Sequence, residues 1–216
     1  MHKVERSMSA SLCFGLIMLL ALASGGCAIG TTRLEISHEP LEPIVQKRAG
    51  DVLVRPFVDK RENIQYIGNK RNGFGMVLGH VATREGVKLD EVMTQYFIEA
   101  LQNAGYNTVL DKSSSGAQAP QLKCDAIIDG EIIEFWMDLY MMVWHKVGVK
   151  VKAINPSDQK VVWERLIQGD EKRVLWVGAT GEFERIVKEA ITIALNRAAK
   201  EFSSDDYYNK TIMKQP

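Results

Sequence analysis

An uncharged apolar segment near the amino terminus, residues 12–23, places the first limit on what this chain can fold into. Lys3 and Arg6 precede it, and the small residues of 23–26 lead from it to Cys27. Its 12 residues are too few for a helix that must cross a bilayer, which needs roughly 20. This pattern predicts a cleaved secretory signal over residues 1–26, because such signals begin with basic residues, continue with a short apolar run and end in small residues. Its removal leaves 190 residues, enough for one domain with its own core.

The end of this segment also resembles the lipobox of bacterial lipoproteins. Ser24-Gly25-Gly26-Cys27 has the small residues and the final cysteine of that motif, although leucine is usual where Ser24 stands. The resemblance implies cleavage after Gly26, diacylglycerol on the Cys27 sulfur and acylation, typically by palmitate, of the new amino terminus. Several acyl chains anchor a protein stably where one chain is marginal. Because Ala28 and not aspartate follows the cysteine, the sorting rule for such proteins implies the periplasmic face of the outer membrane. An ordinary secretory signal with an incidental cysteine is the alternative.

Charge and cysteine content exclude some classes of partner and bond. The chain has 27 basic and 27 acidic residues, so no basic excess points to nucleic acid. If Cys27 carries lipid, Cys124 has no partner and no disulfide is expected. Cys124 precedes an apolar strand, which predicts a packing role for its side chain.

The remaining chain divides into three parts. Residues 27–50 contain Pro40 and Pro43, several charges and little periodicity, which predicts a lipidated tether that lets a domain stand off the membrane. Residues 51–203 form the predicted globular domain, and residues 204–216 a polar tail.

Within the globular domain, the pattern predicts five strands and two helices. A helix is expected from Leu89 to Ala104, where apolar residues recur every three or four positions and Gly105 follows as a cap. A second, longer apolar stripe begins after Thr180, and Gly130 marks a bulge or a close approach of another element. The predicted strands are 51–58, ending near Pro56, then 106–110, 124–138, 146–154 and 160–168. The order β-α-β-β-β-β-α predicts an α+β fold, a two-layer sandwich with a mainly antiparallel sheet of about five strands and two helices on one face.

No pattern in the sequence supports catalysis or a cofactor. The phosphate-binding and nucleophile-elbow motifs are absent, and His38, His80 and His145 lack metal-ligand spacing. Cys124 would need a paired base to act as a nucleophile. We therefore predict that the protein is not an enzyme and has no catalytic residues, cofactor or metal.

Four carboxylates in one predicted strand leave two readings open. They could form a pair for hydrolysis, or they could line the solvent-facing side of the strand, which the pattern favours. These residues are Asp129, Glu131, Glu134 and Asp138.

Two segments are candidate binding surfaces. The stretch 62–86 is rich in glycine and is predicted as a long loop that contains Lys70 and Arg71. Within it, Asn69–Gly75 could bind an anion, and the Asn63–Gly79 loop could dock on a partner. The run 135–144 is so rich in aromatic and apolar residues that one face could bind a partner, the alternative being a strand covered on both sides. The predicted partner-binding residues are Asn69, Lys70, Arg71, Asn72, Phe74, Met76, Trp136 and Trp144.

Several of these segments together resemble the YajG-type family of bacterial lipoproteins. They are the lipobox, the strand end Val58-Asp59-Lys60-Arg61, the run from Ile67 to Met76 (IGNKRNGFGM), Ala104-Gly105-Tyr106 and Asp129-Gly130-Glu131-Ile132. The resemblance covers about residues 50–202. The order of elements is also similar to the small domain of the TolB amino terminus, of CsgG-type secretion lipoproteins and of auxiliary lipoproteins of lipid transporters. The family implies an outer-membrane-attached periplasmic domain, and it brings no catalytic motif to carry over.

Three hypotheses follow. The first is a non-enzymatic accessory lipoprotein, anchored by lipid on Cys27, whose domain docks on another cell-envelope protein. The second is a carrier of a lipid or small apolar ligand, held between the helices and the sheet and associated with an envelope transport system. The third, an enzyme, requires a pocket in which His80 or His145 lies beside carboxylates.

Overall fold

The structure, a computed structural model, describes residues 29–111, 123–140, 142–174 and 180–213. These residues form one nine-stranded sheet and three helices. The helices are α2 (Leu89–Ala104), α3 (Thr180–Ser203) and α4 (Asp205–Thr211). The strands are β1 (Thr32–Leu34), β2 (Asp51–Val54), β3 (Val58–Asp59), β4 (Gly68–Arg71), β5 (Val77–Thr83), β6 (Asn107–Leu110), β7 (Ala126–Leu139), β8 (Val143–Ile154) and β9 (Val161–Arg173).

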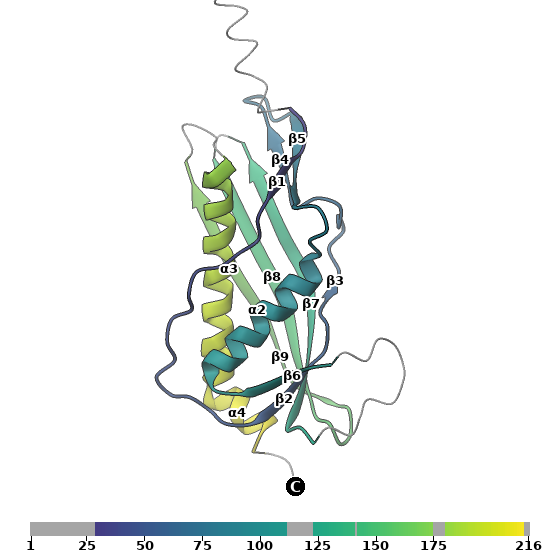
Figure 1. The fold of residues 1–216 in the computed structure, drawn as a ribbon, viewed down its shortest axis with the longest axis vertical. Coiled ribbons are helices and arrows are strands. Elements are labelled where there is room, and N and C mark those ends of the chain that lie inside the picture. The colour runs from purple at the N-terminus through teal and green to yellow at the C-terminus, as the bar shows by residue number, and fades with distance from the viewer. Residues whose placement is uncertain (1–28, 112–122, 141, 175–179, 214–216) are drawn as a thin grey trace, which may run out of the picture.

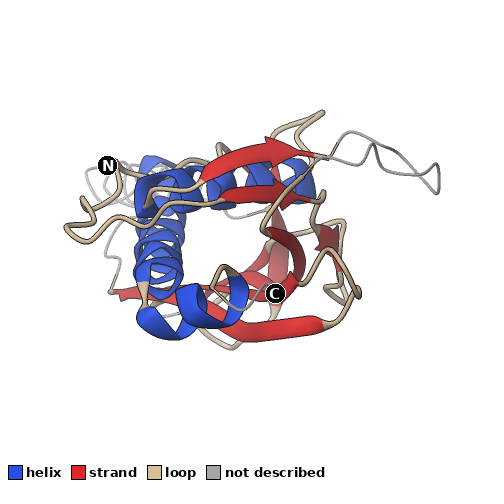
Figure 2. Ribbon diagram, turned by 90° about the horizontal axis from the view of Figure 1, so that it is seen from below, coloured by secondary structure: helices blue, strands red, loops and turns tan. Residues whose placement is uncertain are grey.

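The sheet is built around the long strand β7. On one side β7 pairs antiparallel with β8 along its length, and β8 pairs with β9. On its other side, β2, β3 and β4 pair with successive parts of β7, all parallel to it. At one end the sheet continues from β2 to β6, and at the other from β4 through β5 to β1 (Figure 1). Figure 2 shows that the sheet is curved and that the helices lie on its concave side.

The predicted fold class is therefore wrong. In place of about five mainly antiparallel strands and two helices, nine strands form a mixed sheet with three helices. Pro56 interrupts the first predicted strand and separates β2 from β3, because proline cannot donate to the ladder. The segment 62–86, predicted as a loop, contains β4 and β5. Five of the eight strand pairings are parallel, a property that the local pattern does not encode.

The helix predictions are confirmed where periodicity was strong. α2 has the predicted bounds, and Gly105 caps it in the left-handed conformation, with φ of 105°. The apolar stripe of α3 is entirely buried: Phe183, Ile186, Val187, Ala190, Ile191, Ala194, Leu195, Ala198 and Phe202. No helix in the described ranges is both long and apolar enough to cross a membrane.

Two glycines let elements approach closely. A Cβ added to Gly130 would overlap the Phe57 ring, which confirms the close approach predicted there. A Cβ added to Gly169 in β9 would overlap the carbonyl oxygen of Ala190, so β9 and α3 touch without space between them. The core thus lies between one face of β7–β9 and the helices.

The described part of the predicted tether, from Ile29 to Gly50, packs against the helices. Leu34 and Ile36 are buried, and the Tyr96 hydroxyl donates to the Ile36 carbonyl at 2.8 Å. The backbone N–H of Glu39 donates to Thr192 Oγ1 at 2.9 Å. This segment is therefore part of the folded domain. The predicted signal 1–26, Cys27 and the predicted flexible loop 113–120 lie outside the described residues.

The carboxyl-terminal segment, predicted as a polar tail, contains α4. Ser204 caps this helix by accepting a hydrogen bond from the N–H of Tyr207 at 3.2 Å. Tyr207 is fully buried, and its ring contacts those of Tyr106, Trp163 and Phe202. One aromatic residue in a polar stretch therefore anchors the end of the described chain to the core.

Candidate functional site

The hairpin between β4 and β5 contains six of the predicted partner-binding residues. Asn72 shapes its turn, because the Asn72 side-chain oxygen accepts hydrogen bonds from the N–H groups of Phe74 at 2.9 Å and Met76 at 3.0 Å. Gly75 adopts a φ of 84°, which a side chain would strain. The Asn72 amide therefore serves the hairpin itself.

The other polar residues of the hairpin also make contacts within the domain. Arg71 forms an ion pair with Asp138 of β7 at 3.0 Å and donates to the Gly75 carbonyl at 3.1 Å. Lys70 is only 7 % exposed, and its Nζ donates to Thr32 Oγ1 at 2.9 Å. The Asn69 side chain lies 3.0 Å from His80 Nδ1. These contacts hold the hairpin to its neighbours.

The side chains that do project from the hairpin are apolar. Phe74 is 90 % exposed and Met76 is 59 % exposed. Tyr140, in the turn after β7, lies against the hairpin, where its hydroxyl donates to the Gly73 carbonyl at 3.0 Å. We call the exposed residues at this end the tip patch: Ile29, Phe74, Met76, Val77 and Tyr140.

The remaining two predicted residues, Trp136 and Trp144, lie on adjacent strands on the sheet face away from the helices. Trp136 pairs with Lys146, and Trp144 pairs with Asp138, so the two indoles are diagonal neighbours. Both are half-buried, and Ile133 beside them is 42 % exposed. We call Ile133, Trp136 and Trp144 the tryptophan patch. The helices α2 and α3 lie in front of the strands in Figure 1, on the other face.

Opposite charges line the same outer face. Glu131 pairs with Lys152 at 3.2 Å, and Asp129 lies 3.4 Å from Arg55. With Asp138 paired to Arg71, three of the four predicted carboxylates have basic partners on neighbouring elements. This arrangement is the one expected of a solvated sheet face.

The three histidines lie in separate environments. His38 contacts Glu99 at 3.0 Å on α2, and His80 stacks on Tyr66 with ring centroids 4.1 Å apart. His145 is fully buried against Phe135. Burial, with the nearby Arg61 charge, lowers the pKa of His145 to about 3. Among the described residues, no group of three or more histidine, cysteine or acidic side chains is placed to hold a metal ion.

Cys124 packs at the edge of a small apolar cluster. This cluster is formed by the buried side chains of Leu53, Ile127 and Ile154. Burial raises the pKa of the Cys124 thiol, which keeps it protonated and unreactive at neutral pH. The contacts agree with the predicted packing role.

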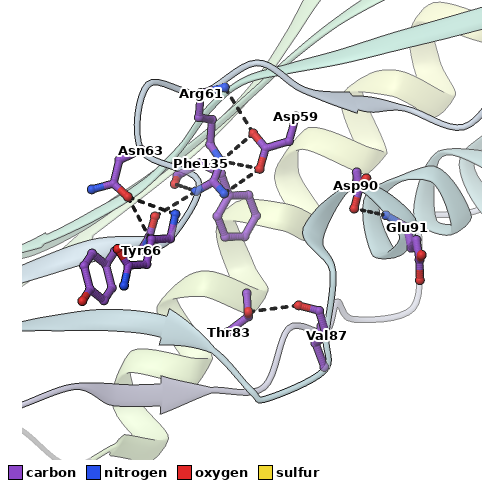
Figure 3. A network of polar contacts seen from close by, with 10 residues as sticks. Asp59, Arg61, Asn63, Tyr66, Thr83, Val87, Asp90, Glu91 and Phe135 are labelled. Carbon is purple, nitrogen blue, oxygen red and sulfur yellow. Dashed lines mark hydrogen bonds and ion pairs between the residues drawn. The ribbon is translucent and has the colours of Figure 1, made fainter.

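The role of Arg61, which stands at the end of the first predicted strand, was not predicted from the sequence. The Arg61 side chain is 6 % exposed and forms an ion pair with Asp59 at 2.7 Å. It also donates to the carbonyls of Tyr66 at 3.1 Å and Phe135 at 3.2 Å, which ties the 60–67 loop to β7 (Figure 3). Charged residues directly after a strand are usually solvated, so no local signal distinguished this one.

Two surface clefts flank this arginine. One, of about 480 Å³, lies between the 60–63 loop and residues 133–136 of β7, and therefore includes Trp136. The other, of about 410 Å³, lies between residues 58–67 and the start of α2. Both are open to solvent on the outside of the domain and do not lie between α3 and β9.

Comparisons with known proteins identify the fold but no family. No protein-family model matches the chain, and no curated protein matches it. Among solved structures, a DUF330 protein from Xanthomonas campestris has a TM-score of 0.51 and 14 % identity, covering 82 % of this chain and 94 % of that one. A hypothetical protein from Chlamydia trachomatis has a TM-score of 0.48 and 10 % identity, covering 77 % and 100 %.

Another similar structure is described as a lipoprotein. It comes from Neisseria meningitidis and has a TM-score of 0.37 and 12 % identity, covering 69 % of this chain and 98 % of that one. The match to the Xanthomonas protein, with a TM-score of 0.51 and 14 % identity, shows a shared fold and no more.

Proposed function

We propose that this protein is a non-enzymatic lipoprotein of the bacterial outer membrane, held at its periplasmic face by lipid on Cys27, and that its domain docks on another envelope protein. The lipobox-like residues 24–27 support the anchor, and Ala28 supports the outer membrane. Membership of the YajG-type family is part of this proposal and rests on the sequence resemblance alone.

The observation that carries the docking function is the tryptophan patch. Trp136 and Trp144 lie side by side on a sheet face that no helix covers in the described part of the chain, and Trp136 lines the 480 Å³ cleft. Indole rings supply a large share of the binding energy at protein interfaces, especially beside charged rims. Here Lys146 lies over the Trp144 ring, with Nζ 5.4 Å from the centroid.

The carrier hypothesis has less support. It requires an enclosed apolar space between the helix layer and the sheet. At Gly169 the backbone of β9 is in direct contact with α3, and the facing side chains of Val147, Val149 and Ile167 are buried. The two clefts around Arg61 are instead open and lined by a mixture of polar and apolar residues.

Replacing Cys27 with serine tests the anchor. A serine hydroxyl cannot receive the thioether-linked lipid, so we expect Cys27→Ser to move the protein from the membrane fraction almost completely to the soluble fraction. Its thermal unfolding should match that of the unmodified chain. Fractionation of cells followed by immunoblotting measures the distribution. A serine variant that stays in the membrane fraction would disprove lipid attachment at this residue.

A photo-crosslinking amino acid at Lys172 tests docking through the tryptophan patch. Lys172 is exposed and pairs with Trp144 across β8 and β9. We expect one specific protein adduct in intact cells. The double variant Trp136→Ala with Trp144→Ala should reduce the yield of this adduct about 30-fold, because hot-spot residues of this kind contribute about 2 kcal/mol or more to the binding free energy. Mass spectrometry identifies the adduct.

The matched control places the same amino acid at Gln95, which is exposed on the helix side of the domain. The same adduct from position 95 would exclude docking through this patch. If the double variant does not fold, the single variants decide: docking here is also excluded if no folded single variant loses the adduct.

A further inference from the structure

We propose that the tip patch inserts into the lipid surface that carries the Cys27 anchor, so that the β4–β5 hairpin is a second membrane contact. This inference rests on the proposed lipid anchor. It assigns to Phe74 and Met76 a lipid partner in place of the protein partner predicted from the sequence.

The first step is the distance that the chain allows between Cys27 and the hairpin. Gly30 contacts β5 directly: its N–H donates to the Leu78 carbonyl at 3.4 Å, and its carbonyl accepts from His80 at 3.3 Å. Gly79 permits this approach, because a Cβ there would overlap Gly30. Gly30 is three positions after Cys27 in the sequence, and an extended chain covers at most about 3.6 Å per position. A lipid on Cys27 would therefore hold Gly30, and the hairpin that Gly30 contacts, within about 11 Å of the modified residue.

The second step is the chemistry of the surface at this end. Phe74, Met76 and Ile29 are 90 %, 59 % and 73 % exposed, and Val77 and Tyr140 adjoin them at 44 % and 46 %. Residues 72–76 carry no charge. Aromatic and apolar side chains grouped at one end suit the boundary between headgroups and acyl chains, where tyrosine also positions its hydroxyl.

The third step is that several backbone groups of the hairpin turn already have hydrogen-bond partners within the domain. In a lipid environment, an N–H or C=O group without a partner is costly. The Asn72 side chain accepts from two N–H groups of the turn, and the Asn72 backbone N–H donates to the Met76 carbonyl at 2.9 Å. The Tyr140 hydroxyl and the Arg71 guanidinium bind the carbonyls of Gly73 and Gly75. Insertion would therefore break none of these bonds.

The same geometry orients the domain. The β4–β5 hairpin lies at one end of the long axis, and α4 lies at the other (Figure 1). The turn after β8, which includes Ser157, is also far from the hairpin, because β8 runs 12 residues from Val143. At about 3.3 Å per residue this strand is roughly 40 Å long. The domain would stand upright, with the tryptophan patch facing sideways along the membrane.

A photo-crosslinking amino acid at position 74 tests the proposal in isolated membranes that carry the full lipid-anchored chain. We expect the main adduct to have the added mass of one phospholipid, at least tenfold more abundant than the adduct from the same amino acid at exposed Ser157. A specific protein adduct at position 74, without lipid, would overturn the proposal. Equal lipid labelling from positions 74 and 157 would do the same.

A second measurement uses the Cys27→Ser chain with vesicles of phosphatidylethanolamine and phosphatidylglycerol. We expect weak flotation with the vesicles, reduced at least about tenfold by Phe74→Ser with Met76→Ser, because two large apolar side chains no longer enter the lipid. Glu85→Ser, at another exposed loop position, should have no effect. If Phe74→Ser with Met76→Ser binds vesicles as well as its parent, the inference fails.

These outcomes separate the two proposals. Release of Cys27→Ser from cell membranes, together with absent lipid labelling at position 74, contradicts the hairpin contact and leaves the anchor supported. Retention of Cys27→Ser in the membrane fraction contradicts the anchor, and vesicle flotation of that same chain then tests the hairpin independently.

Discussion

Arg61→Ala is expected to lower the free energy of unfolding by about 3–5 kcal/mol, the range measured when one partner of a buried ion pair is removed. The substitution leaves the Asp59 carboxylate, 17 % exposed, without its guanidinium. It also leaves the carbonyls of Tyr66 and Phe135 without the donors that bind them now. Chemical denaturation, analysed for both midpoint and slope, measures the change.

Lys60→Ala is the matched control for Arg61, because Lys60 is the preceding residue and is exposed. Its removal should change the free energy of unfolding by no more than about 0.5 kcal/mol. Arg61→Lys should recover only part of the loss, since lysine keeps the charge but not the fork that reaches Asp59 and two carbonyls. Equal effects of Arg61→Ala and Lys60→Ala would show that the buried network does not support the fold.

His145 is expected to make the protein less stable as the pH falls below about 6.5. The pKa of this buried imidazole is about 3 in the folded protein, against 6.5 for an ordinary histidine. Between these values the unfolded chain binds a proton that the folded chain does not, so the free energy of unfolding decreases with decreasing pH. At 1.36 kcal/mol per pKa unit, the loss from this residue is about 2 kcal/mol at pH 5. Urea denaturation between pH 5 and 8 measures this slope.

His145→Leu isolates the contribution of this histidine from those of other titrating groups. Within the described residues, neither ring nitrogen of His145 has a hydrogen-bond partner of ordinary geometry. The Trp136 backbone raises the pKa of His145, but this effect is smaller than the lowering caused by burial. An apolar side chain in its place should therefore cost little at pH 8 and remove the acid-dependent loss. If the two proteins lose stability in parallel from pH 8 to pH 5, the assignment to His145 is wrong.

The binding surface shows where sequence reasoning succeeds and where it stops. The run from Asn69 to Met76 was recognisable as unusual, and Phe74 and Met76 are indeed exposed. Yet the polar members of this run bind groups of their own domain: Arg71 pairs with Asp138, Lys70 with Thr32 and Asn69 with His80. Whether a charged side chain serves a partner or its own fold depends on groups distant in sequence, such as Asp138, 67 residues from Arg71.

The sequence by itself determined the two main helices of this protein and the cap at Gly105. Helical periodicity and cap chemistry involve residues within a few positions of one another, so a local pattern records them. Only the tertiary structure decided the parallel pairing of β2, β3 and β4 with β7, the burial of Arg61 and Tyr207, and the packing of residues 29–50 against the helices. Each of these depends on which distant segments meet, because strand pairing and burial are set by contacts across the whole chain.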